Sequence, residues 1–281
     1  EKIVQAAFAA FGRVDILINN AGILRDKSFP KMEPDTWKAV LDVHLNGAYH
    51  VTKPAFQIMR DQNYGRIVMT TSAAGLYGNF GQTNYSAAKM ALVGFMNTLK
   101  IEGAKYNVKV NTIAPIAASR LMADIIPPDL LEKMKPEFVA PMVLYLCSES
   151  CPVTGCIYNA GMGSYNRAAI VTAPGVVIGD GKTPPAVEDV SANWARIAEL
   201  GGAREYDQLN AVLGDMLQAF EKKDKPAPAA APPAGGLATV GAVFEKMPQV
   251  FNAEKGKDVD VVFQFNISGE GGGEWYAEIR G

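Results

Sequence analysis

The stretch RIVMTTSAAGLYGNFGQTNYSAAKMALVGFMNTLK (residues 66–100) opens with a short β-branched run and closes with a long helical pattern. Similar short runs and helical patterns alternate around it, at residues 14–19, 35–60, 108–113, 137–148 and 156–159. Strands that alternate with helices in this way pair in parallel and are covered by helices on both faces. The sequence therefore predicts an α/β fold with a doubly wound parallel sheet. Pro54 predicts an irregularity within the first long helix.

Composition narrows the class of protein. The chain has 281 residues, a length that favours two structural units, and its 48% hydrophobic and 20% charged residues are typical of a globular protein. The net charge is −2, and the Lys and Arg residues form no concentrated block, which argues against nucleic acid as a partner. The longest apolar stretches, residues 138–147 and 168–179, are too short to span a bilayer.

Cysteine usage excludes two further classes. Cys147, Cys151 and Cys156 are odd in number, form no Cys-x-x-Cys pair and have no neighbouring histidine. We therefore expect neither a disulfide framework nor a zinc site, and no metal cluster is predicted elsewhere. Small buried thiols in a reducing compartment are the expected state.

Domain organisation follows changes in composition. The alternating pattern ends near residue 165, and amphipathic helices at about 187–200 and 206–221 predict a helical extension over residues 166–221. Residues 222–237, which contain KKDKPAPAAAPPAGG, predict a semi-rigid Pro/Ala linker. Residues 238–281 predict a helix followed by an antiparallel hairpin, the start of a second domain. Because the chain opens within a helical pattern and closes after a strand-like run, we expect a fragment whose targeting signals cannot be read.

Three side chains in the opening stretch suggest acid–base chemistry. Ser72 lies thirteen positions before Tyr85, and Tyr85 lies four before Lys89, so the last two share a helix face. A tyrosinate can accept an alcohol's proton if its pKa falls from about 10 toward neutrality, and a nearby ammonium group favours that fall. Ser72 would hold the substrate oxygen close to Tyr85. A Tyr and Lys at this spacing can also be an ordinary solvated helix face.

The companions of these residues favour the catalytic interpretation. NNAG follows directly after the strand at 14–19, and the serine thirteen before the tyrosine, YSAAK and a later VNTIAP occur in the same order. With these motifs the chain resembles the short-chain dehydrogenase/reductase family, whose fold is Rossmann-like. AGILRDKSF, DVHLNG, NTIAPIAASR and VAPMVLYLCSES resemble the dehydrogenase units of the peroxisomal type 2 multifunctional enzymes within it. That resemblance implies NAD-dependent oxidation of (3R)-3-hydroxyacyl-CoA to 3-oxoacyl-CoA in peroxisomal β-oxidation.

The resemblance also implies residue roles. Tyr85 would be the base, Lys89 would lower its pKa and hold the nicotinamide ribose, and Ser72 would orient the substrate hydroxyl. The residues expected along the cofactor are Asn20, Ala21 and Gly22 on the adenosine side and Ala117, Ala118 and Ser119 near the nicotinamide.

Two departures from the family pattern leave alternatives open. The wider family has an asparagine as fourth catalytic residue, whose main-chain carbonyl holds a water leading to the lysine, and His44 stands at that position here. His44 can serve through its own carbonyl, it can be merely structural, or Asn46 can substitute for it. Pro115-Ile116 replaces the more usual Pro-Gly, which affects the expected contact with the nicotinamide.

Other properties are also implied only by resemblance. The family's glycine-rich phosphate loop and the acidic residue that selects NAD over NADP would precede Glu1, so we expect this chain alone to bind the dinucleotide weakly and to be inactive. TPPAVEDVSANW (residues 183–194) resembles the helical extension of the multifunctional enzymes, and residues 238–281 resemble the start of a lipid-binding sterol carrier protein 2 domain. A homodimer and a peroxisomal location are implied as well.

Two rival functions remain open. One is an NADPH-dependent 3-oxoacyl or steroid reductase, which would use the same three side chains in the opposite direction. The other is a lipid carrier in which the dehydrogenase part is a non-catalytic scaffold.

Overall fold

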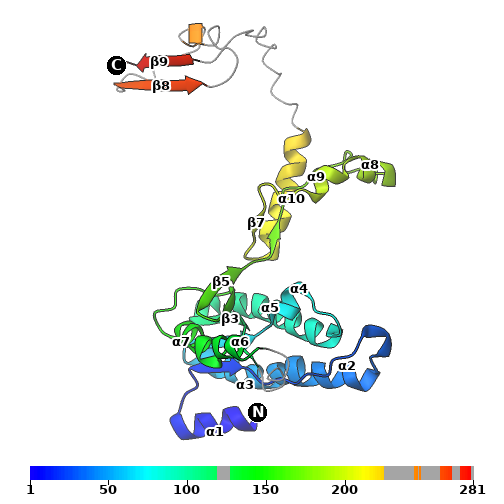
Figure 1. Ribbon diagram of the computed structural model, residues 1–281, viewed down its shortest axis with the longest axis vertical. Helices are drawn as coiled ribbons and strands as arrows, with labels where there is room; N and C mark the ends of the chain where they lie inside the picture. Colours follow the sequence, from blue (N-terminus) through cyan, green and yellow to red (C-terminus); the bar gives the residue numbers. More distant parts are fainter. Residues whose placement is uncertain (119–126, 225–243, 246, 248–259, 268–272, 280–281) are drawn as a thin grey trace. The chain divides into compact units, whose positions relative to one another are not determined.

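The computed structural model describes two compact units of this chain (Figure 1). The described residues are 1–118, 127–224, 244–245, 247, 260–267 and 273–279. The first unit comprises Glu1–Ile178 and Pro185–Leu217, and the second comprises Gly179–Pro184 and Gln218–Gly281. The predicted boundary near residue 165 and the linker at 222–237 stay predictions, since most of that linker lies outside the described residues.

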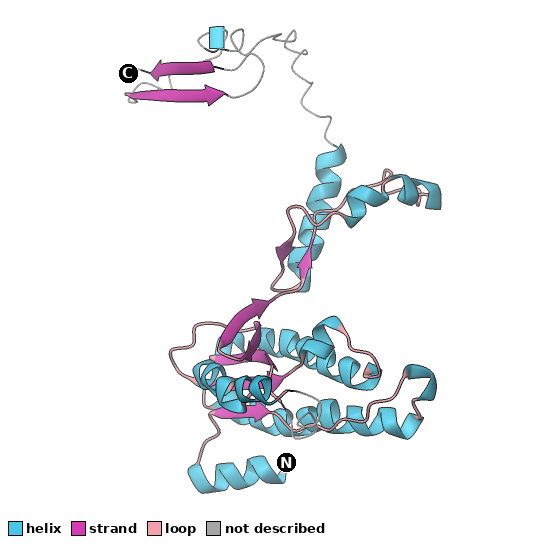
Figure 2. Ribbon diagram, viewed as in Figure 1, coloured by secondary structure: helices cyan, strands magenta, loops and turns pink. Residues whose placement is uncertain are grey.

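A five-stranded sheet forms the centre of the first unit (Figure 2). Its strands lie side by side in chain order: β1 (Ile16–Asn19), β2 (Gly65–Thr70), β3 (Val108–Pro115), β4 (Ile157–Gly161) and β5 (Ser164–Ala168). The first four strands are parallel, which confirms the predicted parallel sheet. β5 was not predicted, and it returns antiparallel to β4 through a tight turn at Met162 and Gly163. Both turn residues have positive φ, 54° and 75°, as two-residue hairpin turns require.

Helices cover both faces of this sheet. They are α1 (Lys2–Phe11), α2 (Pro34–Leu41), α3 (Gly47–Asp61), α4 (Ala73–Tyr77), α5 (Thr83–Gly103), α6 (Pro128–Lys133) and α7 (Ala140–Cys147). One core cluster joins α3 and α5 to the sheet through side chains such as Met59, Met96 and Val110. A second cluster joins α7 to β2, β3 and β4 through Leu146, Val68 and Ile113, and it includes Cys147 and Cys151. The three cysteines are free and buried.

The irregularity predicted at Pro54 lies elsewhere. α3 continues through Pro54, and the helical path is instead widened into a π-helical turn at Asp42–Asn46, between α2 and α3. A proline removes one backbone hydrogen bond, and His50, whose carbonyl loses that partner, is exposed to solvent. The predicted position was therefore wrong, because the helix tolerates Pro54 and the distortion falls at the segment that carries His44.

Beyond β5, the chain continues into the expected helical extension, whose last helix passes from the first unit into the second after Leu217. Its elements are β6 (Val171–Thr172), α8 (Val187–Ala192), α9 (Trp194–Ala198), β7 (Arg204–Glu205) and α10 (Leu209–Asp224), with β6 paired to β7. In the second unit, β8 (Val261–Ile267) and β9 (Gly273–Ile279) form the predicted antiparallel hairpin. Phe244 stacks on Trp275 with ring centroids 4.8 Å apart. The helix predicted ahead of this hairpin lies outside the described residues, apart from residues 244, 245 and 247.

Candidate active site

The predicted site residues gather at one edge of the sheet. β1, β2 and β3 run parallel, so their carboxyl ends lie at the same edge, and Asn20, Ser72 and Ile116 follow those ends within two residues. A hydrogen bond links two of the segments, since Thr70 Oγ1 donates to Asn20 Oδ1 over 3.0 Å. Parallel pairing therefore produces the polar edge that a nucleotide cofactor would meet.

Ser72 and Tyr85 are brought together at this edge. Ser72 caps the short helix α4, where its Oγ accepts a hydrogen bond from the Ala74 amide (3.2 Å). Tyr85 lies in the first turn of α5 and is half-buried. Burial raises the pKa of the Tyr85 phenol, a hydrogen bond with Ser72 lowers it, and the Asp26 carboxylate raises it. The net shift is upward, so the lowered pKa that catalysis needs is not a property of the protein groups alone.

Lys89 lies beneath the ring of Tyr85. Its Nζ is 5.5 Å from the centroid of that ring and donates a hydrogen bond to the Thr70 carbonyl over 2.6 Å. The side chain is only 3% exposed, and burial lowers its pKa from 10.5 to about 8. The helical spacing thus places Tyr85 and Lys89 together, although Lys89 faces the interior and not solvent.

Close packing between α4 and α5 explains that burial. A Cβ added to Gly75 would lie 2.8 Å from Lys89 Cβ and 3.1 Å from the Met90 amide nitrogen, so only glycine fits there. Thr71 Oγ1 also donates to the Lys89 carbonyl over 2.7 Å. The segment that carries Ser72 is therefore fixed against the helix that carries Tyr85 and Lys89.

His44 borders the same site from the π-helical turn. Its ring is 3% exposed and meets the Tyr85 ring edge to face, with centroids 5.2 Å apart and planes at 89°. His44 Nε2 lies 3.0 Å from the Ile23 amide nitrogen and 2.8 Å from the Ile23 carbonyl oxygen, whereas Nδ1 is buried without a hydrogen-bond partner. Burial lowers the pKa of His44, and the nearby Lys89 lowers it further, so the ring is neutral at pH 7.

The alternative residue Asn46 points elsewhere. Asn46 is exposed, and its amide donates to the Asp42 carboxylate one turn earlier (2.7 Å). Gly22, by contrast, lies directly against His44, because a Cβ added there would be 2.4 Å from His44 Cε1. The geometry thus favours His44 over Asn46 at the site and explains why glycine stands at position 22.

Asn84 is a site residue that the sequence reasoning missed. Its side chain is fully buried, its Nδ2 donates to the carbonyls of Arg25 (3.1 Å) and Thr36 (3.3 Å), and its Oδ1 accepts from the Tyr85 amide (2.8 Å). Asn84 therefore fixes the start of α5 against two other segments. The only available signal was an amide residue immediately before the tyrosine.

The segment after β3 lies at the same edge. Ala117 and Ala118 are half-buried. Two backbone hydrogen bonds, both of 2.8 Å, hold this segment: the Ile116 amide donates to the Ala160 carbonyl, and the Ala118 amide donates to the Met134 carbonyl. Ser119, expected beside them, lies outside the described residues.

These residues fit a nicotinamide cofactor. The Lys89 ammonium group gives one hydrogen to the Thr70 carbonyl, which leaves two for ribose hydroxyls. The backbone at Gly22 has no side chain to block close approach, and Asn20 and Ala21 beside it are exposed. Among the described residues, no cluster of His, Cys, Asp or Glu could hold a metal ion.

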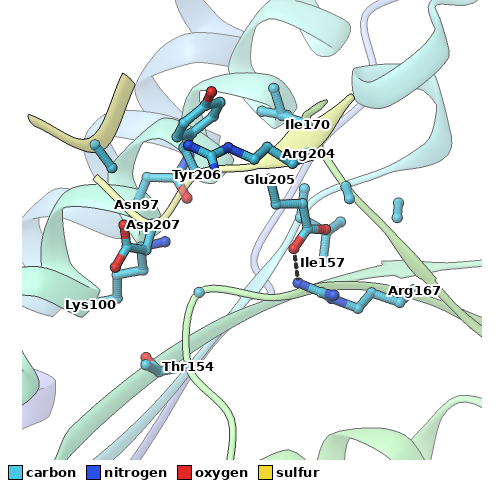
Figure 3. A pocket seen from close by; sticks show the side chains of 14 residues that line it. Asn97, Lys100, Thr154, Ile157, Arg167, Ile170, Arg204, Glu205, Tyr206 and Asp207 are labelled. Carbon is cyan, nitrogen blue, oxygen red and sulfur yellow. Dashed lines mark hydrogen bonds and ion pairs between the residues drawn. The ribbon is translucent and has the colours of Figure 1, made fainter. Parts of the chain in front are cut away.

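A separate pocket lies away from this edge (Figure 3). It has a volume of about 460 Å³ and is lined by residues of α5, β4, β5, β7 and α10, including Lys100, Thr154, Arg167, Glu205 and Asp207. An ion pair between Arg167 and Glu205 crosses it. None of the predicted site residues contributes to it.

Comparisons with known proteins agree with the fold. A family model described as short chain dehydrogenase matches residues 1–127. A short-chain type dehydrogenase/reductase of Mycobacterium tuberculosis is 52% identical over 202 residues, which cover 72% of this chain and 70% of that protein. The chain therefore belongs to the short-chain dehydrogenase/reductase family, a family of oxidoreductases that use a nicotinamide cofactor.

Within that family, two relatives are named for one enzyme. Peroxisomal multifunctional enzyme type 2 of Mus musculus is 42% identical over 253 residues, which cover 88% of this chain and 34% of the mouse protein. The structure of the full-length peroxisomal multifunctional enzyme type 2 from Drosophila melanogaster superposes with a TM-score of 0.68 at 41% identity, covering 73% of this chain and 38% of that one. This chain thus spans little more than a third of the length of these enzymes.

The part of the chain that the structure describes contains no helix long and apolar enough to cross a membrane.

Proposed function

We propose that this chain supplies the catalytic residues of an enzyme that oxidises (3R)-3-hydroxyacyl-CoA to 3-oxoacyl-CoA with NAD, in peroxisomal fatty-acid β-oxidation, and that by itself it is inactive. The observation that carries the proposal is the arrangement of Ser72, Tyr85, Lys89 and His44 at one edge of the sheet, in a chain similar to the peroxisomal multifunctional enzymes. The peroxisomal location and the acyl-CoA substrate rest on those relatives.

The protein groups handle the proton of the reaction. Ser72 Oγ forms a hydrogen bond with the substrate hydroxyl and holds it beside the Tyr85 phenolate, which takes the hydroxyl proton as hydride leaves the carbon that bears this hydroxyl. When bound, the nicotinamide cofactor supplies the hydride acceptor. Lys89 is mostly protonated at pH 7, because its pKa is about 8. Since its Nζ lies 5.5 Å from the centroid of the Tyr85 ring, we expect its charge to stabilise the phenolate. Burial alone raises the pKa of Tyr85, so the positive charges opposed to it are essential.

His44 acts in this proposal as a positioning residue. Its neutral ring holds Ile23 of the cofactor-side loop and packs edge-on against Tyr85, so one side chain links the cofactor loop to the base. By its position in the sequence, His44 corresponds to the family's fourth catalytic residue, and we propose that its main-chain carbonyl takes that role.

Three finer properties belong to the same proposal. Asn20, Ala21 and Gly22 line the adenosine side of NAD, and Ala117, Ala118 and Ser119 line its nicotinamide side. A homodimer is the proposed assembly. Residues 238–281 are proposed to begin a lipid-binding domain, which is supported by the aromatic cluster of Phe244, Phe265 and Trp275 around the β8–β9 hairpin.

Replacing the base tests the catalytic assignment. In the complete protein, Tyr85→Phe removes only the phenolic oxygen, so we expect oxidation of 3-hydroxyacyl-CoA to fall by about 10²- to 10⁴-fold, the range typical of losing a positioned base. Tyr145→Phe on α7, where the tyrosine is 51% exposed, is the matched control and should keep full activity. Activity is followed as reduced cofactor with each hydroxyacyl-CoA enantiomer and with NAD and NADP.

Near-normal turnover by Tyr85→Phe would show that Tyr85 is not the base. Preference for NADPH and for the 3-oxoacyl substrate would favour a reductase instead. Absence of turnover with every substrate, while lipid binding persists, would favour a carrier with a non-catalytic scaffold.

A further inference from the structure

A loop of the chain lies directly against the start of α5. Residues 23–31, here called the strap, run between the end of β1 and α2 and end in a 3₁₀ turn at Phe29–Lys31. Asn84 Nδ2 donates to the Arg25 carbonyl (3.1 Å), Gln82 Nε2 donates to the Asp26 carboxylate (2.8 Å), and the Lys27 amide donates to the Gly81 carbonyl (2.9 Å). All three partners on α5 and its approach lie within four residues of Tyr85.

Charge on the strap is felt at the base. The Asp26 carboxylate raises the pKa of Tyr85, which places the strap within electrostatic range of the phenol. α2, which follows the strap, and α4, which follows Ser72, both contact α5. The strap therefore forms part of the rim of the candidate active site.

The strap presents positive charge that no carboxylate neutralises. Arg25, Lys27 and Lys31 are exposed, and none of them forms an ion pair within the described residues. The Arg25 guanidinium only folds back onto the Leu24 carbonyl (2.9 Å). Asp26 is the strap's single acidic residue, and Gln82 holds it. Three cations thus stand against one carboxylate on nine residues.

Large apolar side chains are exposed on the strap and on the segment that leads to α5. Phe29 of the strap is 68% exposed, Tyr77 at the end of α4 is 71% exposed, and Phe80 in the approach to α5 is 90% exposed. Phe80 immediately precedes Gly81, whose carbonyl binds the Lys27 amide. A group of exposed apolar side chains beside a site indicates a binding surface. A ligand that suits this rim has both an apolar portion and anionic groups.

We propose that Arg25, Lys27 and Lys31 bind the phosphate groups of the coenzyme A portion of the substrate, while Tyr77 and Phe80 contact the methyl and methylene groups of its pantetheine arm. This inference rests on the proposed function and names a substrate subsite within it. Coenzyme A carries its phosphates at the end remote from the thioester, so phosphate contacts belong at the rim and not beside Tyr85. Arginine and lysine are the side chains best suited to phosphate, arginine through paired donors and lysine as a compact charge.

Kinetics with two thioesters separate phosphate binding from catalysis. The substrates are a 3-hydroxyacyl-CoA and the same acyl group on N-acetylcysteamine, which lacks every phosphate. In Arg25→Gln/Lys27→Gln we expect KM for the CoA thioester to rise roughly tenfold with little change in kcat, since exposed charge contacts are individually modest. KM for the N-acetylcysteamine thioester should not change. The control Lys53→Gln/Lys100→Gln removes two cations outside the strap and should leave both KM values unaltered.

A binding measurement reads the subsite without turnover. Titration calorimetry with free coenzyme A and with pantetheine, which lacks the phosphates, should show a preference for coenzyme A that added salt weakens. The double strap variant should lose that preference. Equal affinities for the two compounds, or equal KM increases for both thioesters, would overturn the subsite. Failure of the wild-type protein to oxidise either thioester would instead overturn the proposed function, while calorimetry would still report on the subsite.

Discussion

At the scale of single residues, Lys89 combines burial with charge. It lies 5.5 Å from the ring centroid of Tyr85 and is almost inaccessible to solvent, so its ammonium group is costly to bury. That cost appears as a pKa of about 8, well below the ordinary 10.5. A lysine kept in so unfavourable a place is better explained by its effect on Tyr85 than by fold stability.

Replacing Lys89 should therefore stabilise the protein at neutral pH. The pKa shift from 10.5 to about 8 corresponds to a destabilisation of the folded state by about 3 kcal/mol. This cost applies in full below pH 8, where Lys89 is protonated in both the folded and the unfolded states. As pH rises from 8 to 10.5 the folded state loses its proton first, so that cost disappears. The free energy of unfolding of Lys89→Met should exceed that of wild type by up to about 3 kcal/mol at pH 7, reduced by the loss of the hydrogen bond to Thr70. This difference should become smaller as the pH approaches 10.

Urea unfolding at pH 7 and at pH 10 measures this difference. Lys2→Met, which removes an exposed amine near the amino terminus, controls for the change in net charge. A stability difference between Lys89→Met and wild type that stays constant over this pH range would mean that Lys89 is not buried as a charge. Turnover by Lys89→Met should fall together with its gain in stability.

At the scale of elements, the contact between β3 and β4 positions the segment expected near the nicotinamide. Gly161 ends β4, and a Cβ added there would lie 2.1 Å from the Ile116 carbonyl oxygen. That oxygen belongs to a backbone held by the hydrogen bond from Ile116 to Ala160. A side chain at position 161 must therefore displace the backbone just before Ala117 and Ala118.

Gly161→Ala tests that dependence. We expect a loss of roughly 1–3 kcal/mol in the free energy of unfolding, because the obstacle is backbone and cannot rotate away. Cofactor affinity should fall in the same variant, measured by quenching of protein fluorescence. Gly94→Ala is the matched control, because nothing lies within 4 Å of its added Cβ in the middle of α5, and it should stabilise by roughly 0.5–1 kcal/mol. Equal effects of the two substitutions would contradict the role assigned to Gly161.

At the scale of the whole molecule, the described chain holds two compact units with separate interiors. The first is built around the sheet clusters that contain Met59 and Met96, whereas the second has the aromatic cluster around Trp275. Because a compact unit with its own core can unfold by itself, we expect damage to one core to leave the other folded.

Hydrogen exchange in mild urea can detect this independence. Met96→Ala opens a cavity at a fully packed position, and we expect about 2–5 kcal/mol less protection across β1, β2 and β3 with no change in β8 and β9. Ile101→Ala, on the half-exposed side of the same helix, should alter neither unit. Loss of protection in the hairpin together with the sheet would show one cooperative unit instead of two.

Local pattern was sufficient for much of this architecture. The four parallel strands, the long helix α5, the hairpin β8–β9 and the pairing of Tyr85 with Lys89 follow from periodicity and spacing, which act between residues close in the chain. Two elements did not follow from it. β5 follows a turn with positive φ at Met162, and the π-helical turn at Asp42–Asn46 carries the buried His44, which contacts Ile23 from 21 positions away.

The sequence by itself therefore determined the fold class and the order of strands and helices along the chain. It also singled out Ser72, Tyr85 and Lys89 as candidate site residues. Only the tertiary structure decided which side chains meet across long separations. Four such contacts join residues between 19 and 59 positions apart: Asn84 with Arg25, Asn84 with Thr36, His44 with Ile23, and Lys89 with Thr70. Such contacts depend on how helices pack on the sheet, and that packing also buries Lys89 and sets its pKa, which spacing along one helix cannot specify.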